Sequence, residues 1–218
     1  VGGYDGSNTL RNGEYLDLKK MDAGWKKIPD MNTKRYYLGV AVGDGKLFAV
    51  GGGYDIKTGE YLDLKNMDAG WKELPDMRIE RAHLGVAVGY GKLFAVGGYH
   101  RRHGCLKSGE YLDLENMEAG WKELPDMRTK RADFGVAIGD GKLFAIGGYD
   151  GRHHSSKSGE HLDLENMEAG WKELPDMRTE RVAIGVAIGD GRLVAVGGFQ
   201  DRRHGHSKSG ECLRCMDH

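Results

Sequence analysis

The chain has 218 residues and a formal net charge of −1, with 30% of its residues charged, so overall charge does not draw it toward nucleic acid or an acidic substrate. Its 36 glycines and 4 prolines fit neither collagen, which needs glycine at every third position, nor disorder, which lacks the apolar runs present here. No stretch approaches the ~20 apolar residues of a membrane helix. Three cysteines are too few for a disulfide framework, which favours a reducing, cytoplasmic location.

One sequence unit recurs along the chain. Its tryptophans, Trp25, Trp71, Trp121 and Trp171, are 46, 50 and 50 residues apart. Each lies between Tyr-Leu-Asp-Leu (His-Leu-Asp-Leu in the last unit) and Pro-Asp-Met, and residues 107–130 and 157–180 differ at only two of 24 positions. Such repetition predicts a tandem array. We expect one domain, 1–218, with a partial unit at 1–31, full units at 35–77, 81–127 and 131–177, and a partial unit at 181–218.

Each unit predicts four short strands. The first, as at 85–88, is apolar, and in most units an Asp-Gly pair suited to a type I′ hairpin follows it. The second, as at 92–98, is also apolar throughout, which indicates a sheet covered on both faces. The third, as at 110–114, alternates in polarity. The fourth, as at 121–127, carries charges and Pro125 and therefore suits an outer edge. These features predict an all-β propeller of four-stranded antiparallel blades.

Four marks of the unit resemble the kelch repeat: the double glycine after the second strand, the tyrosine of the third, the tryptophan of the fourth, and the Leu-Pro-Asp-Met that follows. The period of ~50 residues agrees. The stretch between the third and fourth strands is longer than in most of the family. The resemblance, closest to the kelch domain of BTB–kelch adaptors, implies a propeller with about four blades in this chain. These blades form either a four-blade ring or a fragment of a larger ring. The four-blade ring would close by joining the first and second strands of the C-terminal partial unit to the third and fourth strands of the N-terminal partial unit. A fragment would favour self-association.

The loops between the second and third strands, together with the connections between units, open on one face of a propeller. The loops at 99–107, 149–157 and 199–208 carry formal charges of +3, +1 and +2. We therefore predict that this face binds an acidic protein segment through charge-assisted arginine contacts, as the resemblance to BTB–kelch ubiquitin-ligase adaptors also implies. The candidate partner-binding residues are Arg101, Arg102, His103, Arg152, His153, His154, Arg202, Arg203, His204, Arg128 and Arg178. The alternative is that these loops are merely polar and solvated.

Other interpretations remain open. The arginines repeated in every unit, Arg35, Arg81, Arg131 and Arg181, are predicted to be structural. His100, His103 and Cys105 lie close in sequence, and Cys212 and Cys215 have the spacing of half a zinc site, but no second such pair exists. We expect no metal, no cofactor and no catalytic residue, because most tyrosines and aspartates recur as packing residues would. The alternatives to an adaptor are an actin-binding cytoskeletal protein and a metal-dependent kelch-fold enzyme.

Overall fold

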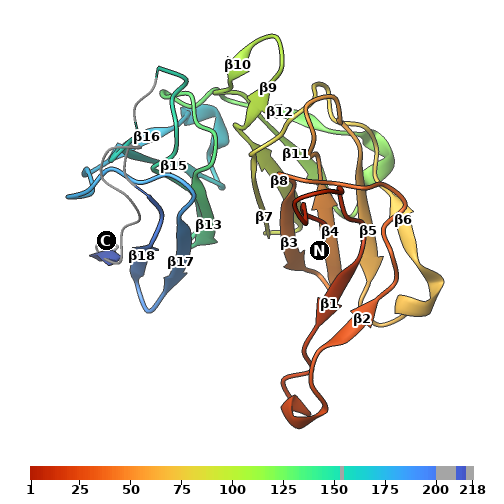
Figure 1. Cartoon of the computed structure of the whole chain (residues 1–218). Coiled ribbons are helices and arrows are strands. Elements are labelled where there is room, and N and C mark those ends of the chain that lie inside the picture. The colour runs from red at the N-terminus through yellow and green to blue at the C-terminus, as the bar shows by residue number, and fades with distance from the viewer. Residues whose placement is uncertain (153–154, 200–209, 215–218) are drawn as a thin grey trace.

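The computed structural model describes residues 1–152 and 155–199 in full and the backbone of 210–214. Small antiparallel sheets follow one another along the chain (Figure 1). Three of these sheets have four strands each. The first full blade consists of β3 (Gly39–Gly43), β4 (Lys46–Val50), β5 (Gly59–Asp63) and β6 (Trp71–Glu73). The second consists of β7 (Gly85–Gly89), β8 (Lys92–Val96), β11 (Gly109–Asp113) and β12 (Lys122–Leu124). The third consists of β13 (Gly135–Gly139), β14 (Lys142–Ile146), β15 (Gly159–Asp163) and β16 (Lys172–Leu174).

Smaller elements flank and decorate these blades. The N-terminal sheet pairs β1 (Gly13–Tyr15) with β2 (Lys26–Ile28), and the C-terminal sheet joins β17 (Gly185–Gly189), β18 (Arg192–Val196) and β19 (Gly210–Arg214). A hairpin of β9 (Tyr99–His100) and β10 (Gly104–Cys105) rises from the second blade. The long stretch between third and fourth strands forms single 3-10 turns, η1 (Met21–Ala23), η2 (Met67–Ala69), η3 (Met117–Ala119) and η4 (Met167–Ala169).

Hairpins between first and second strands use the predicted turn. Asp140 and Gly141 have φ values of 49° and 70°, the left-handed pair that a type I′ turn requires. In the second blade Tyr90 takes the aspartate's place with φ 53°. The turn brings all five residues of β13 into register with β14.

First strands of neighbouring blades contact one another directly. Glycine makes this possible, since a Cβ on Gly85 would lie 2.1 Å from Val136 Cγ2 and one on Gly135 would lie 2.0 Å from Val186 Cγ2. Such distances are far inside van der Waals contact. The first strands are therefore the innermost ones, and their spacing sets how the blades fan out.

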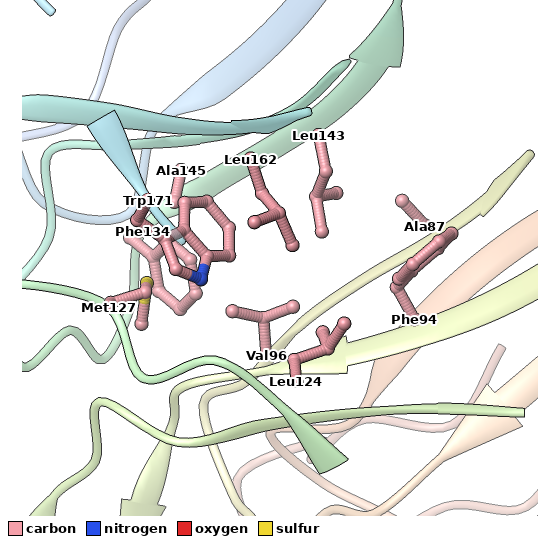
Figure 2. Packing of buried hydrophobic residues seen from close by; sticks show 10 residues of the cluster. All are labelled: Ala87, Phe94, Val96, Leu124, Met127, Phe134, Leu143, Ala145, Leu162 and Trp171. Atoms are coloured by element: carbon pink, nitrogen blue, oxygen red, sulfur yellow. The ribbon is translucent and has the colours of Figure 1, made fainter. Parts of the chain in front are cut away.

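The hydrophobic core lies between blades rather than within one. Figure 2 shows Trp171 of the third blade beside Met127 and Phe134 in one such layer. Trp121 is buried in the equivalent layer and donates from Nε1 to the carbonyl of Pro75, at 2.8 Å, on the preceding blade. Trp71, Trp121 and Trp171 are each buried in one of these layers.

Two details differ from the sequence prediction. The fourth strand is three residues long, Lys122–Leu124 in the second blade, because Pro125 lacks the N–H that would continue the ladder. Of the two arrangements that the sequence left open, the described residues do not form the shared blade of a four-blade ring, since the N-terminal and C-terminal sheets are separate and β19 pairs with β18. Three valines on strands near the two ends of the chain are exposed: Val40 and Val42 of β3 and Val196 of β18.

Candidate functional site

A buried arginine in each full unit fixes the loops that carry the candidate site. Arg81, 1% exposed, contacts Glu110 Oε1 through Nε at 3.1 Å and Nη2 at 3.0 Å. Its Nη1 also donates to the carbonyls of Gly97 and Ser108, each at 2.9 Å, which are the two ends of the loop between second and third strands. Burial lowers the pKa of Arg81, and the Glu110 carboxylate opposes that shift. The predicted structural role of these arginines is confirmed, and we call this arrangement the arginine clasp.

The chain enters each first strand through a residue in the left-handed region. These residues, Tyr37, His83, Asp133 and Ala183, have φ values of 55°, 53°, 51° and 52°. Their amides form a ladder from blade to blade: His83 donates to Tyr37 O at 2.8 Å, Asp133 to His83 O at 3.1 Å, and Ala183 to Asp133 O at 2.7 Å. We call these four residues the inner ledge. Left-handed φ is costly for residues other than glycine, asparagine and aspartate, so the ledge stores backbone strain.

Ledge side chains meet aromatic rings from the neighbouring loops. His83 Nδ1 lies 2.6 Å from Asp133 Oδ1, and the His83 ring stacks on Tyr37 with centroids 3.8 Å apart. Tyr54 approaches Tyr99 edge-on at 5.8 Å. The pKa of Tyr54 is raised by burial and by its tyrosine neighbours. Together these groups enclose a cavity of about 400 Å³, here called the mouth cavity, lined by Tyr54, His83, Tyr99, Arg101, Ala132, Asp133 and Tyr149.

The β9–β10 hairpin, at the top of Figure 1, carries three of the predicted partner-binding residues, Arg101, Arg102 and His103. Here His100 Nδ1 accepts the backbone N–H groups of Arg102 and His103, at 3.0 and 3.2 Å, while its Nε2 lies 3.0 Å from Glu80. Arg101 pairs with Asp55 at 3.3 Å. This second hollow, of about 600 Å³, is called the hairpin cavity and is lined by Tyr54, Asp55, Glu80, His100, Arg101, Arg102 and His103.

Comparison with known proteins identifies the repeat. Residues 80–128 and 130–178 each match the model of the kelch motif. The chain therefore contains kelch repeats. The solved structure of YjhT superposes on 90% of this kelch chain and 71% of its own length, with a TM-score of 0.74 and 16% identity, which shows a shared fold. No curated protein sequence matches the chain. The described helices are all single 3-10 turns, and none has the length or apolar character needed to cross a membrane.

Six of the eleven predicted partner-binding residues belong to the described part of the chain. Arg101, Arg102 and His103 gather around the hairpin cavity, and Arg152 is exposed in the following loop. Arg128 pairs instead with Glu173 of the neighbouring blade's fourth strand, at 2.8 Å, and Arg178 is exposed at the equivalent position. The remaining five lie outside the described residues: His153, His154, Arg202, Arg203 and His204.

Sequence reasoning missed the acidic and aromatic part of the face. Asp55, Glu80 and Asp133 stand among the basic groups, so the two cavities together carry charges of both signs. None of the predicted partner-binding residues is a tyrosine, whereas Tyr54, Tyr99 and Tyr149 line the mouth cavity. One signal was available, because the ledge position reads Tyr, His, Asp and Ala in successive units, whereas the arginine two positions before it and the Gly-Val that begins two positions after it are the same in all four.

The proposed metal grouping of His100, His103 and Cys105 does not converge. Cys105 is buried, and desolvation raises the pKa of its thiol to about 11, so it stays protonated at neutral pH. His100 already uses both ring nitrogens. Across residues 1–152 and 155–199 no three such side chains are arranged to hold a metal ion, and the side chains of Cys212 and Cys215 lie outside the described set.

Proposed function

We propose that this kelch module binds an acidic segment of a protein partner on the face formed by the β9–β10 hairpin. The observation that carries this proposal is the position and pairing of Arg102. Arg102 is exposed at the hairpin cavity, and no carboxylate among the described residues pairs with it. A guanidinium in this position can take a partner carboxylate through two parallel hydrogen bonds.

The rest of the hairpin supports this role. Arg101 and Asp55 form an ion pair with side chains 72% and 74% exposed, the kind that contributes ~0–1 kcal/mol, so a partner carboxylate can displace Asp55 at little cost. The hairpin itself is held by His100, whose side chain is only 12% exposed. The basic groups are therefore presented on a fixed support rather than on a mobile loop.

Recognition of an acidic segment would suit the substrate-binding half of a BTB–kelch ubiquitin-ligase adaptor working in the cytoplasm, with neither nucleic acid nor membrane as a partner. This role is tested by sequencing full-length transcripts for a BTB domain and by co-purification of a cullin ligase from cells. An actin-binding kelch protein would instead co-sediment with filaments.

The binding proposal is tested with a panel of fluorescein-labelled nonapeptides rich in glutamate and aspartate, measured by anisotropy. Arg101→Glu combined with Arg102→Glu should weaken binding by at least tenfold, because two attractive contacts become repulsive. The matched control is Lys72→Glu with Lys122→Glu, the same charge change on the outer strands β6 and β12. Binding should also weaken as salt rises. Equal affinities of the two double variants would refute the proposal.

A further inference from the structure

We infer that the mouth cavity receives a lysine or arginine side chain from the same partner segment, so that the partner motif combines carboxylates with a neighbouring cation. This inference rests on the proposed function and adds a second subsite to it. The occupant is chosen by the chemistry of the cavity walls, which differs from that of the hairpin beside it.

Aromatic rings form much of the mouth cavity. The Tyr54 ring is at their centre, edge-on to Tyr36 at 6.0 Å and to Tyr99 at 5.8 Å. Tyr54, Tyr99 and Tyr149 line the cavity itself, whereas Tyr36 and Tyr37, the latter with its centroid 6.5 Å from that of Tyr54, are outside the lining. Aromatic faces carry negative partial charge and attract cations placed within ~6 Å of the ring centre, most strongly where several rings surround the cation.

The charge that the cavity leaves unmatched is negative. Asp133 is 44% exposed, and its only side-chain hydrogen bond among the described residues is between Oδ1 and His83 Nδ1. A carboxylate oxygen can only accept, so the proton of this hydrogen bond comes from His83 Nδ1, and the second carboxylate oxygen stays available. The one cation in the wall, Arg101, has its charge offset by Asp55.

The backbone holds Asp133 at this spot. Its left-handed conformation and its amide bond to His83 O fix the direction in which the side chain leaves the ledge. Stacking on Tyr37 fixes the His83 ring in turn. A site whose polar groups are already oriented loses little entropy when the ligand arrives.

The two subsites adjoin. Tyr54 and Arg101 line both cavities, so a cation in the mouth cavity and a carboxylate on Arg102 belong to neighbouring stretches of one short segment. Because one subsite takes a cation and its neighbour takes a carboxylate, the face also selects against a partner segment that is uniformly acidic.

A positional scan tests the inference. A binding acidic nonapeptide is made with lysine at each position in turn and compared with the same peptide carrying norleucine, which has a similar length and no charge. At one position lysine should bind roughly 5- to 30-fold tighter than norleucine, the range for a desolvated cation over aromatic rings. Asp133→Asn should remove that preference, and asparagine tolerates the left-handed backbone there.

The matched control is Asp140→Asn. Asp140 is exposed, has φ 49° and lies in the β13–β14 turn at the opposite end of the strands, so the same chemical change should leave the lysine preference intact. A second readout needs no acidic peptide: n-butylammonium, titrated against n-butanol, should shift the NMR signals of Tyr54 and Tyr99, and Asp133→Asn should abolish the shifts.

The outcomes separate the two proposals. Acidic peptides that bind without any lysine preference, or with one that survives Asp133→Asn, would overturn the cation subsite and leave the basic hairpin standing. Should no acidic peptide bind, the hairpin proposal fails, and butylammonium decides the subsite. Shifts lost in Asp133→Asn support it, and absent or unchanged shifts refute it.

Discussion

Replacing Glu110 with alanine should remove a large part of the stability of the second blade. Glu110 and Arg81 have side chains only 2% and 1% exposed, and their closest contact is 3.0 Å. The variant leaves the Arg81 guanidinium buried without a counter-charge and also removes the acceptor of the Arg78 amide, which bonds Glu110 Oε2 at 2.8 Å. Breaking one side of a buried ion pair costs about 3–5 kcal/mol. We expect a loss of that size in the free energy of unfolding.

The same blade provides the control. Glu123 pairs with Arg78 at 3.1 Å, but the side chains are 66% and 60% exposed, so Glu123→Ala should cost less than about 1 kcal/mol. Both variants are measured by guanidinium unfolding followed through tryptophan fluorescence, since Trp121 packs between the first and second blades. If Glu110→Ala were as mild as Glu123→Ala, the arginine clasp would not hold the blade together, and the structural reading of Arg81 would be wrong.

Two further predictions concern packing between and within blades. Trp121→Ala should cost about 3–5 kcal/mol in the same assay because it empties a buried site and frees the Pro75 carbonyl, and a cost under 1 kcal/mol would contradict the blade interface. His161→Tyr should stabilise by about 1 kcal/mol at pH 7.5, since His161 Nδ1 is buried without a partner among the described residues. Burial, and then the positive charges of Lys142 and Lys172, lower the pKa of His161 in the folded protein. The unfolded chain therefore binds the proton at a higher pH than the folded protein does, and the free energy of unfolding falls as pH drops below about 6.5. The gain from tyrosine should therefore be larger at pH 5 than at pH 7.5, and an equal gain would refute the titration.

The blade could be predicted because its determinants are local. Apolar runs, Asp-Gly pairs and a charged outer segment each act within a few residues, and the structure places Leu93 and Phe94 in the core as their pattern indicates. The ends of the strands and the pairing of the terminal strands were harder to predict. The fourth strand ends before Pro125. At the C-terminal end, β18 pairs with β19, the next strand in the chain, and β1 pairs only with β2 among the described strands.

The candidate site was predicted in part because it is assembled across units. Arg101 and Arg102 were visible as a basic run, but Asp55, which pairs with Arg101, comes from the preceding unit. The mouth cavity likewise brings together Tyr54, Tyr99 and Tyr149, each from a different repeat. Charge summed loop by loop describes such a face poorly, since the pairs form between loops.

The arginine clasp explains how the repeats can be nearly identical while the face between them differs. In the second blade Arg81 binds the carbonyls at both ends of the loop, Gly97 and Ser108, so the loop's base is fixed whatever residues lie at its tip. Arg131 does the same at Gly147 and Ser158. The ledge works in a similar way, because its ladder uses backbone groups only and leaves the side chains free to be Tyr, His, Asp or Ala. Binding specificity can therefore change at the tips and the ledge without loss of the fold, whereas a change in the clasp must alter stability and site geometry together.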